Sequence, residues 1–357
     1  MTTITLKDLP APPPNKIGWP WTEANEPLSN KMPDGSQYPL ISIVTPSYNY
    51  GQFIEETIRS VLLQGYPNLE YIVIDGGSTD DTVEIIKKYE QYLTYWVSEP
   101  DEGQTDAINK GYQHCSGDIF VWLNADDAYA DANCLQEVSK YYQQGYQLIV
   151  GECLNVDEKD KPIKITDEYN GHAPPQNFDQ YLKFWSYVWL PQPAVFIAKE
   201  LTDKSFPLDK SIYCVMDYQF FLKVLSHRPQ SIFLNKTWVK FKYHGENKSL
   251  AGNRNGTSGY LELYQVALTE SRKVYNSWDS FRFKLDADDF MAIQSILDSD
   301  VQPSFKSAVS QLISRPTLIR WKLFWKVFTK SFLGPQMYSN LKNFAFYLVN
   351  SFKFKTN

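Results

Sequence analysis

The sequence predicts an α/β fold in which a mostly parallel central sheet is flanked by helices and followed by a helical C-terminal appendage. Short apolar runs alternate with amphipathic segments over residues 40–123, which is the pattern of β-α-β units. The apolar runs are continuous, as in strands that are buried on both faces. With 357 residues, 43% of them hydrophobic, the chain can bury a large core.

The predicted elements follow one another in a regular order. The strands read LISIVT, LEYIVI, LTYWV and DIFVWL, and the helices between them read GQFIEETIRSVLLQ, DDTVEIIKKYEQ and GQTDAINKGYQHC. One face of the first helix is apolar at helical spacing and belongs to the core: Phe53, Ile54, Ile58, Val61 and Leu62.

Three regions are expected along the chain. Residues 1–39 are rich in Pro and polar residues, so we expect little regular structure there, with Trp19 and Trp21 as anchors onto the main domain. The main domain spans 40–258, and a helical region spans 259–357.

Charge is segregated between the main domain and the tail. Residues 301–357 carry nine Lys or Arg and no Asp or Glu, although the whole chain has a net charge of −6. The aromatic residues of the tail recur at helical spacing beside these lysines: Trp321, Phe324, Trp325, Phe328 and Phe332. One interpretation is that 315–357 contacts an anionic membrane. The alternative is that its aromatic face packs on the main domain. No nucleic-acid motif is present, so nucleic acid is not an expected partner.

Several classes of protein are disfavoured. The four cysteines form no C-x-x-C pair, so we expect neither a disulfide framework nor a zinc site. No secretory signal is recognisable, and no segment reaches the roughly 20 apolar residues of a membrane span, so we expect a cytoplasmic protein with a peripheral position at the inner face of the membrane. Neither G-x-G-x-x-G nor a P-loop follows the first strand.

Polar residues follow the predicted strand DIFVWL. Asn124, Asp126 and Asp127 stand at its carboxyl end, which is where ligands bind in open parallel sheets. Carboxylate oxygens are hard ligands and indicate Mg²⁺ or Mn²⁺. The alternative is a polar turn that caps the next helix.

Two other strand ends carry candidate nucleotide-binding residues. Pro46 and Tyr48 follow the first strand, where main chain and ring would pack on a nucleotide. Asp75 ends the second strand, followed by Gly76 and Gly77, which allow a close backbone approach. A carboxylate at this position suits hydrogen bonding to a nucleobase or a ribose. Both loops are also compatible with ordinary turns.

Three stretches together resemble the family 2 glycosyltransferases, inverting enzymes of GT-A fold: PLISIVTPSYNYGQFIEETIRSVLLQGYPNLEYIVIDGGSTDDT, SEPDEGQTDAINKG and WLNADD. The resemblance covers about residues 19–250. It implies that Asp75 contacts the nucleoside, that Asp106 lies in the nucleotide site, and that Asn124-Ala125-Asp126 occupies the place of the family's D-x-D. The metal would then sit on Asp126, with Asp127 beside it.

Two departures from the family pattern stand out. Asn124 replaces the first Asp of D-x-D, which removes one charge from the site, although its amide can still accept a hydrogen bond. Ile108 stands where many relatives carry Arg, which removes a phosphate contact from that helix.

The resemblance also assigns residues downstream. Asp217 opens the helix in YCVMDYQFFLKVL and matches the acid that relatives use as catalytic base, which an inverting displacement requires. Gln192, in WLPQPAVFIAKEL, would read an acceptor or donor sugar. His244, in KYHGENKS, would help to hold diphosphate or metal. The alternatives are a helix cap or buried ion pair for Asp217 and a structural role for His244.

The sequence therefore predicts a metal-dependent, inverting glycosyltransferase of polysaccharide biosynthesis. It would move a sugar from a nucleotide donor, a UDP-sugar by preference, to a hydroxyl of a glycan or lipid-linked glycan. One alternative is a sugar nucleotidyltransferase, which the missing Gly-rich basic loop disfavours. Another is a non-catalytic scaffold, which retention of Asp126 and Asp217 disfavours.

Overall fold

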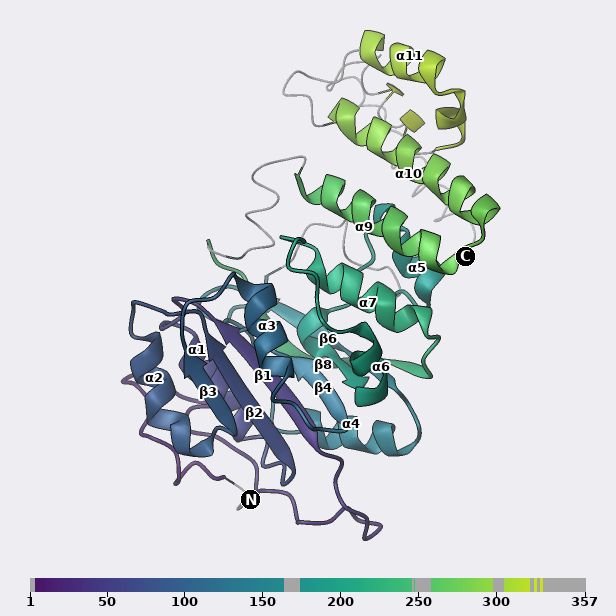
Figure 1. Cartoon of the computed structure of the whole chain (residues 1–357). Helices are drawn as coiled ribbons and strands as arrows, with labels where there is room; N and C mark the ends of the chain where they lie inside the picture. Colours follow the sequence, from purple (N-terminus) through teal and green to yellow (C-terminus); the bar gives the residue numbers. More distant parts are fainter. Residues whose placement is uncertain are drawn as a thin grey trace, which may run out of the picture. The chain divides into compact units, whose positions relative to one another are not determined.

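The structure is a computed structural model and describes residues 4–163, 174–245, 247, 258–297, 305–321, 324–325 and 328–329 (Figure 1). The chain divides into two compact units, Met1–Ala251 and Gly252–Asn357, and each is described by itself. The expected boundary near residue 258 stays a prediction, because residues 248–257 lie outside the described ranges.

A sheet of eight described strands forms the centre of the first unit, in the order β3-β2-β1-β4-β7-β6-β8-β5. β1 pairs in parallel with β2 and β4, and β2 pairs in parallel with β3, as the sequence predicts. Beyond β4 the sheet is mixed, because β7 is antiparallel to both its neighbours and β5 is antiparallel to β8. The strands are β1 (Ile41–Ser47), β2 (Leu69–Asp75), β3 (Tyr95–Ser98), β4 (Ile119–Trp122), β5 (Ala128–Tyr129), β6 (Leu148–Val156), β7 (Val195–Ala198) and β8 (Ser231–Lys242).

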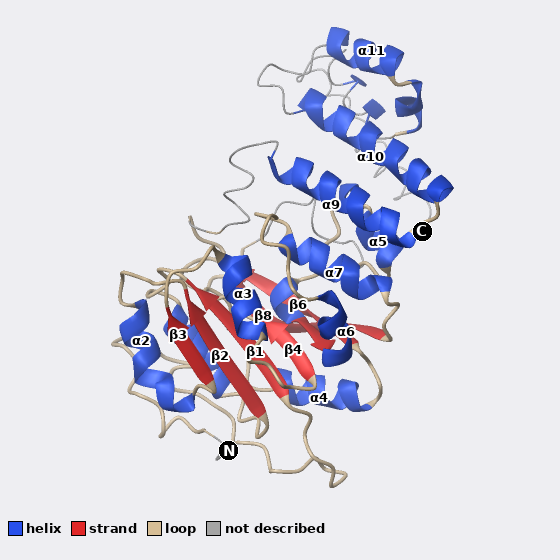
Figure 2. Cartoon of the chain, viewed as in Figure 1, coloured by secondary structure: helices blue, strands red, loops and turns tan. Residues whose placement is uncertain are grey.

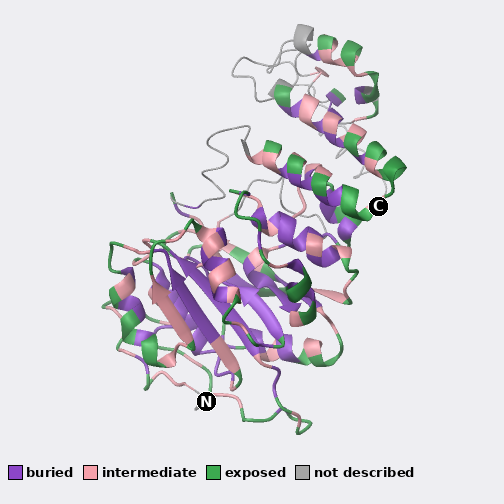
Figure 3. Cartoon of the chain, in the orientation of Figure 1, coloured by how far each residue is buried: buried purple, intermediate pink, exposed green. Residues whose placement is uncertain are grey.

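Helices cover both faces of this sheet, which is why its central strands are continuously apolar. Ile119 and Val121 of β4 share a core with α1, α2 and α4, whereas Phe120 and Trp122 pack toward α3 and α7. Figure 2 shows α3 on the near face, and in Figure 3 the central strands are buried. These helices are α1 (Ile54–Leu62), α2 (Thr82–Tyr89), α3 (Gln104–Tyr112), α4 (Cys134–Gln143), α5 (Phe178–Leu182), α6 (Lys199–Ser205) and α7 (Met216–Ser226).

Close packing of α3 on β1 needs a glycine. A Cβ placed on Gly111 would lie 2.4 Å from Cγ1 of Val44, which is closer than any two such atoms can approach. α3 therefore lies directly on the strand, and its first turn reaches the carboxyl end of the sheet.

The N-terminal extension contains turns and no helix or strand over residues 4–40, as expected. Trp21 is buried, and Nε1 of Trp19 donates to the carbonyl of Tyr129 at 2.8 Å, so both tryptophans anchor the extension. The guanidinium of Arg59, a fully buried residue of α1, donates to three backbone carbonyls of this segment.

The described part of the second unit is helical. It consists of α9 (Ser258–Val274), α10 (Ser277–Leu297), α11 (Phe305–Ser314) and the short 3₁₀ helix η4 (Pro316–Arg320). None of the helices in the described ranges of the chain is both long and apolar enough to cross a bilayer.

Part of the aromatic face of the tail is buried within the helical unit. Phe324 is fully buried and packs with Ile293 and Leu318, and Trp321 and Phe328 pack against the same cluster. Phe324 therefore belongs to the core of the helical unit, whereas Trp325 is 40% exposed, and a membrane contact of 315–357 stays a prediction. Phe332 and the rest of 331–357 lie outside the described residues.

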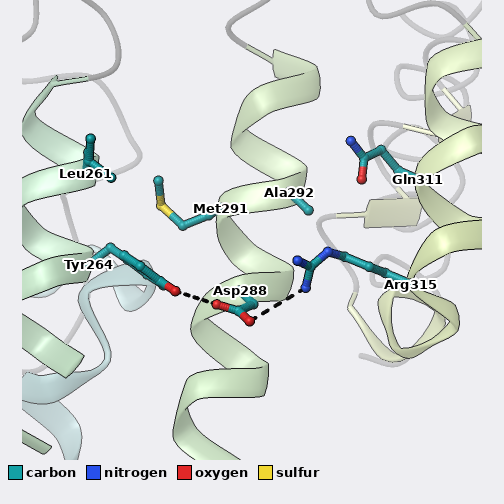
Figure 4. Close-up of a pocket in the computed structure, with 7 residues that line it drawn as sticks. All are labelled: Leu261, Tyr264, Asp288, Met291, Ala292, Gln311 and Arg315. Carbon is teal, nitrogen blue, oxygen red and sulfur yellow. Dashed lines mark hydrogen bonds and ion pairs between the residues drawn. The ribbon is translucent and has the colours of Figure 1, made fainter.

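A cavity of about 400 Å³ opens in this helical unit (Figure 4). The carboxylate of Asp288 at its base accepts a hydrogen bond from the hydroxyl of Tyr264 at 2.5 Å and lies 3.8 Å from the guanidinium of Arg315. Leu261, Met291, Ala292 and Gln311 complete the lining. The contacts of Asp288 join α9 and α10 to the end of α11.

Candidate active site

The loops after β1 and β2 are tied together. The backbone N–H of Asn49 donates to Oγ of Ser78 at 2.7 Å, and Oδ1 of Asn49 accepts from the N–H of Thr79 at 2.9 Å. Tyr48, the first residue of the loop after β1, is 57% exposed, so its ring is available to a ligand. Pro46, in contrast, is buried within β1.

Asp75 ends β2, and its carboxylate is saturated by its own turn and by the end of β3. Oδ2 accepts from the N–H of Ser78 at 2.9 Å and from Oγ of Ser98 at 2.6 Å. It also accepts from the N–H of Gly77, which has a φ of +81° that a side chain would oppose. Because the residue is fully buried, the carboxylate here shapes the turn, and its contact with a nucleoside stays a prediction.

Asn124 is the centre of a network at the carboxyl end of β4. Its Oδ1 accepts from Nε2 of Gln104 at 2.9 Å, and its Nδ2 donates to Oε1 of Gln192 at 3.1 Å. Nε2 of Gln192 in turn donates to the carbonyl of Trp122 at 2.7 Å, which fixes the orientation of both amides. The network joins α3, β4 and the turn before β7.

Asp126 and His244 lie together although they are far apart in sequence. Nε2 of His244 is 2.9 Å from Oδ2 of Asp126, and Nδ2 of Asn247 donates to the same oxygen at 3.1 Å. Oδ1 of Asn247 also accepts from the backbone N–H of His244 at 2.6 Å. All three residues are buried, so Asn247 holds the Asp126–His244 pair in place.

Asp127 is a buried carboxyl group with unused bonding capacity. Its Oδ1 has no hydrogen-bond partner among the described residues, and its Oδ2 accepts a long bond of 3.3 Å from Asn124. Burial, and then the charge of Asp126, raise the pKa of Asp127 well above its ordinary value. The hydroxyl of Thr57 holds this turn through the carbonyls of Ala125 and Asp127.

A buried ion pair supports the histidine. Nζ of Lys242, at the end of β8, is 2.9 Å from Oε2 of Glu56 on α1, and both side chains are about 5% exposed or less. The ring of Phe53 lies beneath the lysine and 4.6 Å from the ring of His244. The pair thus fastens the end of β8, and with it His244, to α1.

These residues fit a divalent cation. The described chain contains no group of three His, Cys, Asp or Glu side chains arranged as a complete metal site. Asp126 and His244 nevertheless supply one oxygen and one nitrogen ligand at one point, and the unpartnered oxygen of Asp127 lies in the same turn. An incomplete set suits a cation that takes its remaining ligands from water and substrate oxygens.

Asp106, in the first turn of α3, is engaged in ion pairs. Its carboxylate lies 3.2 Å from Lys210 and 3.5 Å from Lys110. Burial acts to raise the pKa of Asp106, but the N–H of Glu102 and the two lysines outweigh it, so the pKa lies below its ordinary value. Its contact with a nucleotide stays a prediction.

Asp217 lies in the first turn of α7, half-buried among aromatic rings. Its Oδ1 accepts from the N–H of Tyr218. Burial, and then the charge of Asp217, raise the pKa of Tyr181, which places that ring near the carboxylate. Trp189 is partly exposed and lies 5.7 Å from the ring of Tyr218. Tyr181 and Tyr218 are buried, so Trp189 is the ring of these three that is accessible to a ligand.

The structure brings together five of the residues that the sequence singles out, Asn124, Asp126, Asp127, Gln192 and His244. It adds three that sequence reasoning missed. Gln104 and Asn247 stood inside quoted motifs, and only the fold shows their contacts. Glu56 is not among the candidate residues of the sequence, and no sequence signal marked its pairing with Lys242.

A parallel half-sheet with polar turns at the carboxyl ends of β1, β2 and β4 defines an α/β protein of nucleotide-binding type. The model of the family described as Glycosyl transferase family 2 matches residues 42–205 of the chain. An uncharacterized glycosyltransferase of Mycobacterium tuberculosis is 42% identical over 93 residues, which are 26% of this chain and 36% of that protein. TuaG of Bacillus subtilis, named as a teichuronic acid biosynthesis glycosyltransferase, is 38% identical over 25% of this chain and 36% of its own length.

Solved structures share the fold. S. aureus TarS 1-349 in complex with UDP-GlcNAc has a TM-score of 0.58 at 14% identity, with 83% of this chain and 92% of that chain covered. The mannosyltransferase PcManGT of Pyrobaculum calidifontis, in complex with GDP-Man and Mn²⁺, has a TM-score of 0.52 at 17% identity, with 85% and 86% covered. The predicted GT-A fold is confirmed. The matched segments span about a third of the first curated relatives' lengths.

Proposed function

We propose that the protein transfers a sugar from a nucleotide-sugar donor to a hydroxyl of a glycan or lipid-linked glycan, with inversion at the anomeric carbon. The observation that carries this proposal is the turn 124–127, where Asp126 and His244 meet beside the amide network of Asn124. The turn stands at the carboxyl end of β4, within the residues that the model of Glycosyl transferase family 2 matches.

The donor is proposed to be a UDP-sugar. The exposed ring of Tyr48 is available to the base. The turns that follow β1 and β2 are joined beside it by the hydrogen bond between Asn49 and Ser78. TarS supports this choice through its complex with UDP-GlcNAc, whereas the complex of PcManGT with GDP-Man makes GDP-sugars the second candidate.

Inversion requires a single in-line displacement. The carboxylate of Asp217 accepts the proton of the acceptor hydroxyl as its oxygen attacks the anomeric carbon, and the nucleoside diphosphate leaves from the opposite side. Gln192 and Asn124 hold fixed amide groups near the end of β4, which orient sugar hydroxyls. Trp189, which is partly exposed, supplies a ring for the acceptor near Asp217.

The proposed cofactor is Mg²⁺ or Mn²⁺ on Asp126 and His244, with Asp127 beside them. A bound cation would act as a Lewis acid that stabilises the charge of the departing diphosphate. Asn247 keeps Asp126 and His244 in register for this role.

The acceptor is proposed to be a growing cell-wall or surface polysaccharide. The name of TuaG supports this class of product. A lipid-linked acceptor would place the enzyme at the cytoplasmic face of the membrane.

A donor screen tests the proposal. Purified protein, Mn²⁺ and each sugar nucleotide are incubated with a lipid-linked glycan extract, and release of the nucleoside diphosphate is scored. We expect release with one or a few UDP-sugars. Asp217→Asn should bind the donor normally but turn over roughly 10²- to 10⁴-fold more slowly. Release of pyrophosphate from a nucleoside triphosphate and a sugar phosphate would instead indicate the nucleotidyltransferase, and donor binding without turnover would indicate the scaffold.

A further inference from the structure

The turn between α9 and α10 exposes large apolar side chains. Trp278 is 65% exposed, Phe281 is 51% exposed and Val274 is 42% exposed. The rings of Trp278 and Phe281 lie 6.0 Å apart, so they form one surface. Residues 272–282 are called the aromatic tip below.

The side chains of Trp278 and Phe281 do not pack into the core of the helical unit. They are three residues apart and share a face of α10, whereas the core of the helical unit takes Phe283, Ala287 and Phe290, which are 7% exposed or less. Exposed aromatic pairs of this kind mark interaction surfaces, because leaving them in water is unfavourable.

The charge around the aromatic tip is positive. Arg272, Lys273 and Arg282 are exposed. Lys273 is paired with the buried Glu270 at 2.8 Å, but no described acidic side chain forms a salt bridge with Arg272 or Arg282. The one acid of the tip, Asp279, accepts a hydrogen bond from Asn276 at 2.8 Å and lies at the helix start, where a negative charge is favoured.

We propose that the aromatic tip docks the protein on an anionic phospholipid surface. Trp278 and Phe281 enter the interface between headgroups and acyl chains, and Arg272 and Arg282 contact the headgroups. Docking of this kind depends on the second unit alone and does not rest on the proposed reaction.

The same charges disfavour a second copy of the chain as the occupant. A two-fold contact would place the tips of both copies together, and would therefore bring their arginines into repulsion. The tail is also a weaker anchor than its sequence suggests, because Phe324 is buried in the core of the helical unit.

Vesicle co-sedimentation of the full chain tests the proposal. We expect binding to vesicles of phosphatidylglycerol and phosphatidylcholine, and little binding to phosphatidylcholine alone. Trp278→Ala with Phe281→Ala should weaken binding by about tenfold or more, since two interfacial rings are lost. The matched control is Ile313→Ala, which removes a side chain that is 76% exposed on α11 and should leave binding unchanged.

Two further variants separate the contributions. Salt weakens the attraction between the arginines and the anionic headgroups, because charges are screened within about 8 Å at physiological ionic strength. Arg272→Gln with Arg282→Gln should therefore remove most of the salt-sensitive part of the binding. Trp278→Phe should still bind, but should lose the fluorescence quenching that brominated lipids cause in the wild type.

Four results would overturn the proposal. The first is a double alanine variant that binds vesicles as strongly as the wild type does, and the second is a wild type that does not bind anionic vesicles. The third is fluorescence quenching that is unchanged in Trp278→Phe, and the fourth is a wild type that is dimeric while the double alanine variant is monomeric. The melting temperature of the double variant should stay at the wild-type value, and a marked fall would show a structural role instead.

Discussion

At the scale of single residues, the structure explains why an amide occupies the first position of the 124–126 motif. Gln192 is oriented by the carbonyl of Trp122, so its oxygen faces Asn124 and requires a donor there. Asp127 also places an oxygen toward the same nitrogen. A carboxylate at position 124 would face two oxygens and no donor from that side.

Asn124→Asp therefore tests the amide network. Although it restores the family's D-x-D, we expect it to lower stability by about 1–3 kcal/mol, because the bond to Gln192 becomes a repulsion. Urea unfolding without metal measures the effect, and Asn124→Ser, which keeps a hydroxyl donor, is the matched control. A stability equal to that of the wild type would show that the amide orientation is not required.

The candidate site residues that stand at strand ends could be predicted from the sequence, because period and composition mark those positions. Asn247 and Glu56 could not be predicted, since their roles depend on contacts across more than 100 residues of chain. The saturation of Asp75 was also not predictable, because its donors on Gly77, Ser78 and Ser98 meet only when the turn and the end of β3 fold together.

At the scale of elements, Glu70 joins the amino ends of three strands on the side opposite the site. Its carboxylate accepts from Oγ of Ser42 at 2.6 Å and from the N–H of Ser116 at 2.8 Å. Burial alone would raise the pKa of Glu70, but these hydrogen bonds outweigh it, so the pKa lies below its ordinary value.

Glu70→Gln should lower the melting temperature at pH 7. Because the folded-state pKa is lowered, the stabilising effect is present above the ordinary glutamate pKa of 4.5 and is lost as pH falls through the folded-state value. The melting temperatures of variant and wild type should therefore converge in acid. Calorimetric scans from pH 7 to pH 3 provide the measurement, and a difference that grows toward low pH would refute the linkage.

The alternation of elements was predictable because helical and strand periods are local properties. The four parallel strands and three intervening helices of residues 41–122 follow the predicted order. The antiparallel insertion of β7 between β4 and β6 was not predictable, since it depends on pairing between distant segments of irregular sequence.

At the scale of the whole molecule, the N-terminal extension is part of the first compact unit. Arg59 donates to the carbonyls of Pro10, Pro20 and Trp21 while fully buried, and its guanidinium lies 5.4 Å from the ring of Trp21. The extension therefore satisfies a buried cation of α1 that would otherwise be very costly.

Arg59→Met should destabilise the protein by about 3 kcal/mol or more, because several buried carbonyls lose their donors. Lys16→Met is the control. That lysine lies over the same Trp21 ring at 5.0 Å but is exposed, so its loss should cost about 1 kcal/mol or less. Denaturant unfolding compares the two, and equal effects would contradict the anchoring role of Arg59.

The turn 124–127 is proposed to bind a nucleotide-sugar with a divalent cation. Calorimetric titration of UDP-sugar into the protein with Mn²⁺, and again with chelator, tests it most directly in the wild type and in Asp126→Ala. We expect wild-type binding that requires the metal, and none measurable in the variant, whose fold should persist by circular dichroism. Wild-type binding that is indifferent to chelator, or unchanged affinity in Asp126→Ala, would contradict the account.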